Sequence, residues 1–488
     1  MIEFGVIVFV QLALLVAVVI LREPKLLIPC VVLGLPLEYA STQALDTLGE
    51  SGTGGIIRTL LNPGKAAMIA TIVVATVRAR HNPRALFPDS AIVLPLTALL
   101  LVVVIGVAWS DSGLTNAVMI MPMYVAFVFV APSLIEDRQD LERIVIAFLV
   151  AASVLSVVAI AQRILGVFQW RSILIQSDDY SYRSNAFFAD PNNLARFLAI
   201  SMALAAGMIL VTGPRRLTVH LAAPMLAVST LAIVLTASRS GWLGMLLASF
   251  LVVVMAPIRP YTKLRLTSVA FGGLGFVLIL LFMQGGTNAE RVKSLGAGVE
   301  LVGQREFLIK GGWEMWKDNP LFGVGSGNYQ HTLVTSYLWT LPWWAKTTLS
   351  HTSLISVLAE LGIVGVSIIG LFVARVVVAC KSAYRLSTGR YSRLMAVWCA
   401  AAMIEILFQS QSGGAAARGA VPLPDPGDRG LSRAWGGHAR CGPGSRARGC
   451  QGRPWRGRAP AEPGGFARRA VRCPSAAHAP GKPGRIGR

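Results

Sequence analysis

Two side chains that can do chemistry stand at the edges of long apolar runs. His351 heads the stretch 351-HTSLISVLAELGIVG-365, and Arg239 lies within 236-TASRSGWLG-244. A guanidinium can bind a phosphate through two parallel hydrogen bonds, although an arginine beside a membrane can also snorkel to the headgroups. A histidine at such a place is either part of a functional site or a residue that hydrogen-bonds at a helix interface. The residues alone leave both interpretations open.

The run after His351 also contains Glu360, Gly362 and Gly365. On a straight helix Gly362 lies three turns from His351 on nearly the same face. We therefore expect the two glycines to let a neighbouring helix approach closely. Glu360 is expected on the opposite face, in a structural role.

Arg305 lies near the start of a third segment, 303-GQREFLIKGGWEMWKDNPLFGVGSGNYQH-331. We expect an amphipathic helix on the outer surface whose distinctive residues are Arg305, Trp313 and Trp316, with Glu306, Lys310 and Lys317 on its other faces. The polar sequence 318-DNP-320 ends this helix, and three glycines then form a tight turn, followed by Tyr329. No strand–helix unit surrounds the GxGxG string, so it does not indicate a nucleotide site.

The fourth segment, 183-RSNAFFADPNNLARFLAI-200, begins with Arg183 and contains Asn192. Its 190-DPNN-193 sequence is a helix-start signal, and capping alone can explain those polar residues. A group of aromatic residues, typical of a membrane-interface belt, follows the glycine-rich turn at Tyr337, Trp339, Trp343 and Trp344. A minority of the aromatic residues are candidates to stack on sugar rings.

Membrane helices must position these four segments, because 54% of the 488 residues are hydrophobic and the mean hydropathy is +0.60. Apolar runs of spanning length predict an all-α, polytopic transmembrane bundle of about 12 spans. The expected spans are 4–21, 26–40, 66–77, 91–108, 115–132, 144–166, 193–212, 219–236, 241–256, 266–284, 352–378 and 394–409.

The charges of the connecting segments predict the orientation of the bundle. Lys and Arg concentrate in alternate loops, which contain Arg22 and Lys25; Arg78, Arg80 and Arg84; Arg138 and Arg143; Arg215 and Arg216; Arg259, Lys263 and Arg265; and Lys381, Arg385, Arg390 and Arg393. These loops are expected to face the cytoplasm. One long loop, 285–350, the segment 167–192 and the turn around Arg239 then lie outside.

The end of the chain differs in composition from the rest. Residues 1–410 form the predicted membrane domain, whereas 411–488 are rich in Gly, Pro, Ala and Arg and carry more than half of the net charge of +21. Such a tail cannot bury enough apolar surface to fold and is expected to be disordered. We favour the hypothesis of a shifted reading frame in a GC-rich gene, which the nucleotide sequence tests, over a basic tail that binds nucleic acid or anionic lipid. Nucleic-acid binding is not expected.

The spacing of the cysteines and the first apolar run argue against a metal-binding protein, a disulfide-linked protein and a cleaved signal peptide. The six cysteines lack CxxC spacing, so neither a metal site nor a disulfide framework is expected. The opening apolar run has no basic n-region and no small-residue cleavage site, and it is expected to be a first span rather than a signal peptide.

Taken in order, the four segments resemble the superfamily of O-antigen ligases and polysaccharide polymerases. SRSGW at 238–242, Arg305…Trp313…PLFGVGSG, and His351-Thr-x9-Gly-x-x-Gly carry the resemblance, together with FADPNN, over roughly 180–380. Thr352 departs from the ligase pattern, which has Asn, Ser or Gln after the histidine. This departure slightly favours a polymerase.

The resemblance implies a GT-C-like membrane glycosyltransferase of the bacterial inner membrane that acts on its periplasmic face. Such an enzyme moves a glycan from undecaprenyl diphosphate to an acceptor hydroxyl on a glycan, lipid or protein, in lipopolysaccharide or exopolysaccharide synthesis. Arg239 and Arg305 are the positions expected to stabilise the diphosphate leaving group in place of a metal. His351 is expected to act as general base in an inverting displacement. Further candidate substrate-binding residues are Arg183, Asn192, Trp313 and Tyr329, and no cofactor is expected.

Three functions remain open at this point. A ligase transfers a finished glycan, a polymerase extends the glycan on the same lipid carrier, and a transporter would use the outer loop only as a gate. Transporters show internal repeats and charged residues at the bilayer midplane. Here the spans hold few such charges, Arg163, Glu360 and Glu405, and the halves show no repeat, so the transporter is the least favoured.

Overall fold

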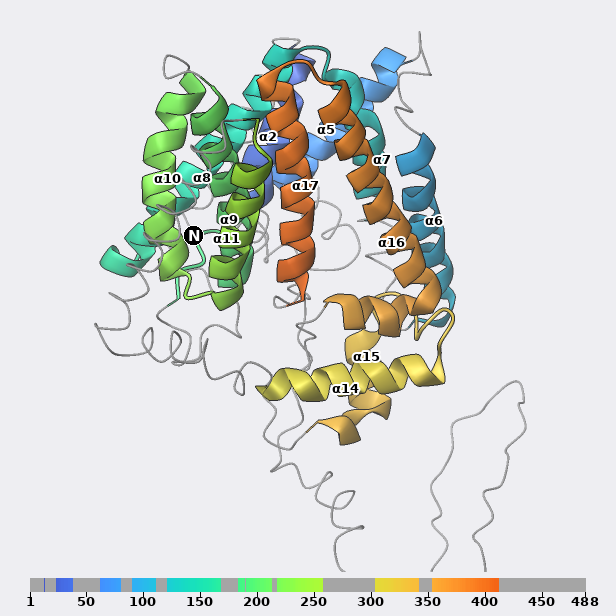
Figure 1. Cartoon of the computed structure of the whole chain (residues 1–488). Coiled ribbons are helices and arrows are strands. Elements are labelled where there is room, and N and C mark those ends of the chain that lie inside the picture. Colours follow the sequence, from blue (N-terminus) through green and yellow to red (C-terminus); the bar gives the residue numbers. More distant parts are fainter. Residues whose placement is uncertain are drawn as a thin grey trace, which may run out of the picture. The chain divides into compact units, whose positions relative to one another are not determined.

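The computed structural model describes residues 13, 23–37, 62–79, 90–110, 121–167, 183–188, 190–212, 217–257, 303–341 and 353–411. Every element within these ranges is a helix and none is a strand (Figure 1). This confirms the predicted all-α class. The predicted spans 4–21 (except Ala13) and 266–284, and the tail beyond residue 411, lie outside the described residues.

Five of the described helices are long and apolar enough to cross a membrane. They are α6 (Ser90–Gly106, continued by the 3-10 turn η6, Val107–Trp109), α8 (Arg138–Leu165), α9 (Pro191–Val211), α16 (Ser353–Leu386) and α17 (Arg390–Ser410). Shorter helices occupy the other predicted spans within the described ranges: α2 (Leu27–Gly34), α5 (Pro63–Arg78), α7 (Met121–Val130), α10 (Leu217–Leu235) and α11 (Arg239–Met255). The count of twelve spans stays a prediction.

Helix α9 forms the centre of the main core. It packs against α10, α11 and α17, and α8 packs against α10. Small residues permit these close contacts, since a methyl group added at Gly241 of α11 would lie 2.4 Å from the Ala195 side chain of α9. A buried hydrogen bond of 2.8 Å between the hydroxyls of Ser156 and Ser229 joins α8 to α10. The helices that carry the fourth segment and the SRSGW motif are therefore held rigidly.

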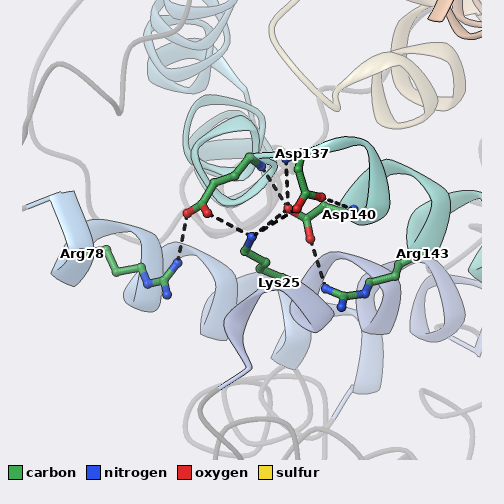
Figure 2. A network of polar contacts seen from close by, with 6 residues as sticks. Lys25, Arg78, Asp137, Asp140 and Arg143 are labelled. Carbon is green, nitrogen blue, oxygen red and sulfur yellow. Dashed lines mark hydrogen bonds and ion pairs between the residues drawn. The ribbon is translucent and has the colours of Figure 1, made fainter.

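A network of ion pairs joins several of the predicted cytoplasmic loops at one place (Figure 2). Lys25, before α2, pairs with Glu136 at 3.0 Å and with Asp140 at 3.2 Å. Arg143 reaches Asp140 at 3.1 Å, and Arg78 at the end of α5 reaches Glu136 at 3.8 Å. Hydrogen bonding to Glu136 and Asp140 raises the pKa of Lys25. The beginning of α8 thus joins segments that are far apart in the sequence.

A fourth cationic segment meets the same end of α8. The guanidinium of Arg138, the first residue of α8, lies 4.6 Å from the ring centroid of Tyr391 at the start of α17. The segments around Lys25, Arg78, Arg138 and Arg390 therefore share one end of the bundle, as the alternation of loop charges requires. That this end faces the cytoplasm stays a prediction.

The length of helix α8 gives the distance from the ion-pair network to the opposite end of the bundle. At 1.5 Å per residue, Asp140 and Gln162 are about 33 Å apart, which is close to the thickness of a bilayer's hydrocarbon core. Gln162 binds the backbone of Asn185 and Ala186 through its side-chain amide, at 2.9–3.2 Å. Residues 183–188 consequently lie at the end of the bundle away from the ion-pair network.

Candidate functional site

Three polar side chains from two separate motifs meet at this second end of the bundle. Arg183 donates to the carbonyl of Thr236 at 2.8 Å and to Oδ1 of Asn192 at 3.0 Å. The hydroxyl of Ser238 donates to the same Asn192 oxygen at 2.7 Å. Arg183, Asn192 and Ser238 are called the polar node below. It ties the fourth segment to the SRSGW motif, two candidates that the sequence could not place relative to each other.

Local chemistry explains why the node forms. Asp190 caps α9 by accepting the backbone N–H of Asn192 at 2.7 Å, so Asn192 stands in the first turn of that helix. Ser238 caps α11 in the same way, accepting the N–H of Gly241 at 3.2 Å. Capping places both side chains at helix starts that face each other. The predicted capping role of the DPNN sequence is confirmed, and the node adds a second role for Asn192.

Arg239 is the first residue of α11 and follows a tight turn from α10. Ala237 in that turn has a positive φ of 49°, and the indole of Trp242 donates to the carbonyl of Ile233 at 3.0 Å. The turn around Arg239 that the sequence predicted is therefore present, and the hydrogen bond from Trp242 in α11 to Ile233 in α10 stabilises it. Arg239 is half-buried, at a helix N-terminus, where the backbone also favours anionic ligands.

The third segment folds as α14 (Gly303–Asp318), a glycine-rich loop at 319–328, and α15 (Tyr329–Ser336). Gly323, Gly325 and Gly327 all have positive φ, as expected of a tight turn. The loop does not pack beside an intact helix, because α16 is broken at Gly362, where φ is 63° and ψ is −163°. The expectation of a straight helix with a second helix against Gly362 is wrong: the neighbour is the loop backbone.

Backbone hydrogen bonds are exchanged between the loop and the break in α16. The N–H groups of Ile363 and Val364 donate to the carbonyls of Pro320 and Leu321 at 3.0 and 3.3 Å. In return, the N–H groups of Val324 and Gly325 donate to the carbonyls of Ala359 and Glu360 at 2.8 and 3.1 Å. The loop thereby satisfies backbone groups that the break would otherwise leave unpaired in an apolar setting.

Glu360 and Tyr329 complete this junction. The Glu360 carboxylate accepts the N–H of Gly327 at 2.9 Å and that of Tyr329 at 3.1 Å. The Tyr329 side chain is buried and donates to the carbonyl of Leu308 in α14 at 2.5 Å. Glu360 thus has the structural role expected of it. Tyr329, a candidate substrate-binding residue, lies inside a small core with Leu308 and Met315.

Trp313 lies on the exposed side of α14, with 42% of its surface accessible. Its ring centroid is 4.6 Å from that of Trp316. The predicted separation of faces is wrong, since Glu306, Lys310 and Lys317 are exposed on the same side as Trp313. Spacings of three, four and seven residues return to one helix face, and the buried side is that of Leu308 and Met315.

Two further aromatic residues border this exposed face of α14. The Lys310 ammonium lies 5.9 Å from the ring centroid of Trp339, and the Tyr337 hydroxyl donates to Asp318 at 2.5 Å. Burial and this hydrogen bond raise the pKa of Tyr337 to about 12. The phenol is therefore a hydrogen-bond donor at neutral pH and not a base.

The last turn of α17 adjoins both parts of the candidate site. A methyl group at Gly244 of α11 would lie 2.5 Å from the side-chain nitrogen of Gln409. The side chain of Gln411 accepts the N–H of Leu354, in the first turn of α16, at 3.4 Å. The starts of α11 and α16 therefore flank one helix end. The side chain of Arg305 and the whole of His351 lie outside the described residues, so the convergence of Arg239, Arg305 and His351 stays a prediction.

Sequence reasoning missed the role of Ser238 and the presence of Arg196 inside the bundle. Arg196 stands one helical turn beyond Asn192 in α9, and its Nε and Nη2 atoms are buried without a hydrogen-bond partner. Its position within a span was visible in the sequence and signals a functional or paired residue. Within the described ranges, no group of three His, Cys, Asp or Glu side chains is arranged to hold a metal.

Comparison with known proteins agrees with the motif resemblance. Residues 224–370 match a family model described as O-antigen ligase. A search of curated proteins gave no significant match. The matched stretch contains Arg239, Arg305 and His351, whereas Arg183 and Asn192 precede it. The predicted resemblance is confirmed, and the match supports assignment of the chain to the O-antigen ligase family.

Proposed function

From its assignment to the O-antigen ligase family through residues 224–370, we propose that this chain is a glycosyltransferase of the bacterial inner membrane. It transfers a glycan from undecaprenyl diphosphate to an acceptor hydroxyl on the periplasmic face. The polar node is the observation that carries the proposal. It fixes Arg239 at the start of α11, at the end of the bundle opposite the ion-pair network. The acceptor hydroxyl belongs to a glycan, a lipid or a protein.

The proposed reaction is a single displacement at the anomeric carbon. The acceptor oxygen forms a bond to this carbon, the bond to the diphosphate oxygen breaks, and the configuration inverts. His351 removes the acceptor's proton. Arg239 and Arg305 stabilise the negative charge that develops on the departing diphosphate, a role that a divalent metal fills in other enzymes.

The remaining candidate residues divide into two groups. Arg183 and Asn192 hold the turn that presents Arg239, so they act on the donor side. Trp313 is exposed and able to stack on a sugar ring, whereas the buried Tyr329 shapes the loop beneath it. Loss of Arg183 or Asn192 should therefore impair use of the donor, and loss of Trp313 should impair binding of a glycan.

The membrane arrangement in this proposal is that of twelve spans with 285–350 and the polar node outside. It is supported by the gathering of the cationic segments at one end of α8. It is also supported by the hydrogen bond of 2.9 Å from Ser110, just beyond α6, to the Ser326 carbonyl in the glycine-rich loop. Helix α6 follows the cationic segment at 78–84, so its far end should lie on the opposite side of the membrane.

A polysaccharide polymerase is the second candidate, favoured by Thr352, which follows the histidine where ligases have Asn, Ser or Gln. The two candidates use the same donor and differ in the acceptor. The test is reconstitution of the full chain in vesicles with an undecaprenyl-diphosphate glycan. A separate lipid or protein acceptor is supplied in one arm, and only further lipid-linked glycan in the other. Product length and linkage then distinguish transfer from extension.

Matched variants test the assigned roles in the same assay. His331 lies in α15 of the same region and is exposed, so His331→Ala is the control for His351→Ala. Arg163 is exposed near the end of α8, so Arg163→Ala is the control for Arg239→Ala. We expect His351→Ala, Arg239→Ala and Arg305→Ala to insert normally and to lose at least about 100-fold in transfer rate. Equal effects of a variant and its control would contradict the assignment.

A further inference from the structure

The carboxylate of Glu360 lies where the mechanism gives it no chemical step. It accepts two backbone N–H groups, those of Gly327 and Tyr329, one on each oxygen. A third contact involves its backbone, whose carbonyl accepts the N–H of Gly325 at 3.1 Å. One residue of α16 therefore binds two alternate positions of the glycine-rich loop, Gly325 and Gly327, and the first residue of α15, Tyr329.

These bonds join two pieces that each lead to a proposed catalytic residue. On one side, α14 contains Arg305 in its first turn and continues into the loop. On the other, the part of α16 before the break, 353–361, begins two residues after His351. Between them lie Leu308, Met315, Val324, Tyr329 and Ala359, which form one buried cluster. A methyl group at Gly312 of α14 would lie 2.4 Å from Ile355 of α16, so the two pieces are in direct contact.

The geometry points to Glu360 as a positioning residue: its carboxylate locks the glycine-rich loop into the break of α16 and so holds α14, which contains Arg305, against the part of α16 that follows His351. This inference rests on the proposed function for the roles of those two residues. The lock itself rests only on the hydrogen bonds and the cluster described above. Since misplacement by about 1 Å can cost about 100-fold in rate, loosening the lock should impair catalysis without removing a catalytic group.

Two variants loosen the lock to different extents. Glu360→Ala removes both side-chain acceptors. Glu360→Gln keeps one acceptor oxygen and turns an NH₂ group toward the other N–H. Glu314→Ala is the matched control, because Glu314 makes a surface ion pair of 2.9 Å with Lys317 on α14. All three variants are made in the full chain and reconstituted in nanodiscs.

Hydrogen exchange tests the lock independently of any activity. We expect the amides of Gly327 and Tyr329 to exchange about tenfold faster in Glu360→Ala, with a smaller increase in Glu360→Gln, since a charge-assisted bond is lost at each amide. Exchange in α8 and α17 should not change, and Glu314→Ala should match the unmodified protein. Unchanged exchange at Gly327 and Tyr329 in both variants would overturn the lock.

Kinetics test the positioning role. We expect kcat to fall about 10- to 100-fold in Glu360→Ala while KM for the lipid-linked donor stays within about twofold. The pH profile of kcat should keep its shape, because Glu360 transfers no proton. A shifted profile, or a rise in KM with kcat unchanged, would overturn the positioning role. If the unmodified protein transfers no glycan at all, the proposed function fails, and so does the proposed effect of Glu360 on catalysis. The exchange data still decide whether the Glu360 carboxylate locks the loop.

Discussion

Gly362 offers the sharpest test of the junction between α16 and the glycine-rich loop. Its φ of 63° and ψ of −163° fall in a region that is essentially restricted to glycine. A methyl group there would lie 2.2 Å from the carbonyl oxygen of Leu321, far inside contact distance. Gly362→Ala must therefore both strain the backbone and push the loop out of the break.

The expected magnitude follows from two contributions. Backbone strain of this kind costs about 1–3 kcal/mol. Displacing the loop breaks up to four backbone hydrogen bonds between 320–325 and 359–364, at about 0.5–1.5 kcal/mol each. Because the strained backbone can relax once the loop has moved, the two contributions are not fully additive, and we expect a loss of about 3–5 kcal/mol.

Gly370 in the same helix is the matched control. Nothing lies within 4 Å of a methyl group added at Gly370, and its backbone is helical. Gly370→Ala should therefore stabilise the protein by up to about 1 kcal/mol through helix propensity.

The assay is unfolding of the full chain by SDS in mixed micelles, followed by tryptophan fluorescence. Because Trp313 and Trp316 belong to the helix that the loop follows, their signal should report the release of the loop first. A difference of less than about 1 kcal/mol between Gly362→Ala and Gly370→Ala would refute the described junction.

Three further predictions concern other parts of the site. Asn192→Ala should reduce glycan transfer about tenfold or more, because the turn before Arg239 loses its acceptor, while the neighbouring Asn193→Ala should match the unmodified protein in initial rate. Ser156→Ala should cost about 0.6 kcal/mol in SDS unfolding, and adding Ser229→Ala should cost little more, because the pair shares one bond. Trp313→Ala should raise KM for the glycan acceptor by about tenfold with kcat unchanged, if its exposed ring stacks on sugar. An unchanged KM would assign this ring to the membrane interface instead.

Sequence reasoning succeeded where local chemistry decides the structure. Apolar runs gave helices in the expected places, and the predicted cap in 190-DPNN-193 starts α9. The alternation of loop charges correctly grouped the segments around Lys25, Arg78 and Arg138. In each case a residue and its neighbours within a few positions, or a simple rule of charge placement, carries the information.

It failed where a distant backbone segment overrides the local preference. The apolar run after His351 favours one continuous helix, and nothing within it shows that the loop at 320–325 enters at Gly362. The break exists because that loop exchanges hydrogen bonds with α16. The exposed face of α14 was misassigned for a simpler reason. Glu306, Lys310 and Lys317 were separated from Trp313 by residue type, although spacings of three, four and seven residues place them on the same side of the helix.

The two ends of α8 differ in how the protein pairs the cations that lie there. At the first end, the carboxylates of Glu136 and Asp140 lie within 3.0–3.8 Å of Lys25, Arg78 and Arg143, so cations there are already neutralised by the protein. At the second end, two of the acceptors that hold Arg183 are a carbonyl and an amide oxygen, both uncharged.

Neutral acceptors orient a guanidinium without cancelling its charge. An anion arriving at the polar node therefore meets a guanidinium whose charge these two bonds do not cancel. Replacing Asn192 by Asp tests this electrostatic role, because the new carboxylate keeps both hydrogen bonds and adds a negative charge beside Arg183. Asn192→Asp should preserve the fold, by SDS unfolding, and yet weaken binding of a diphosphate-linked lipid more than Asn192→Ala does. Tighter binding to Asn192→Asp than to Asn192→Ala would contradict an electrostatic role for this end of the bundle.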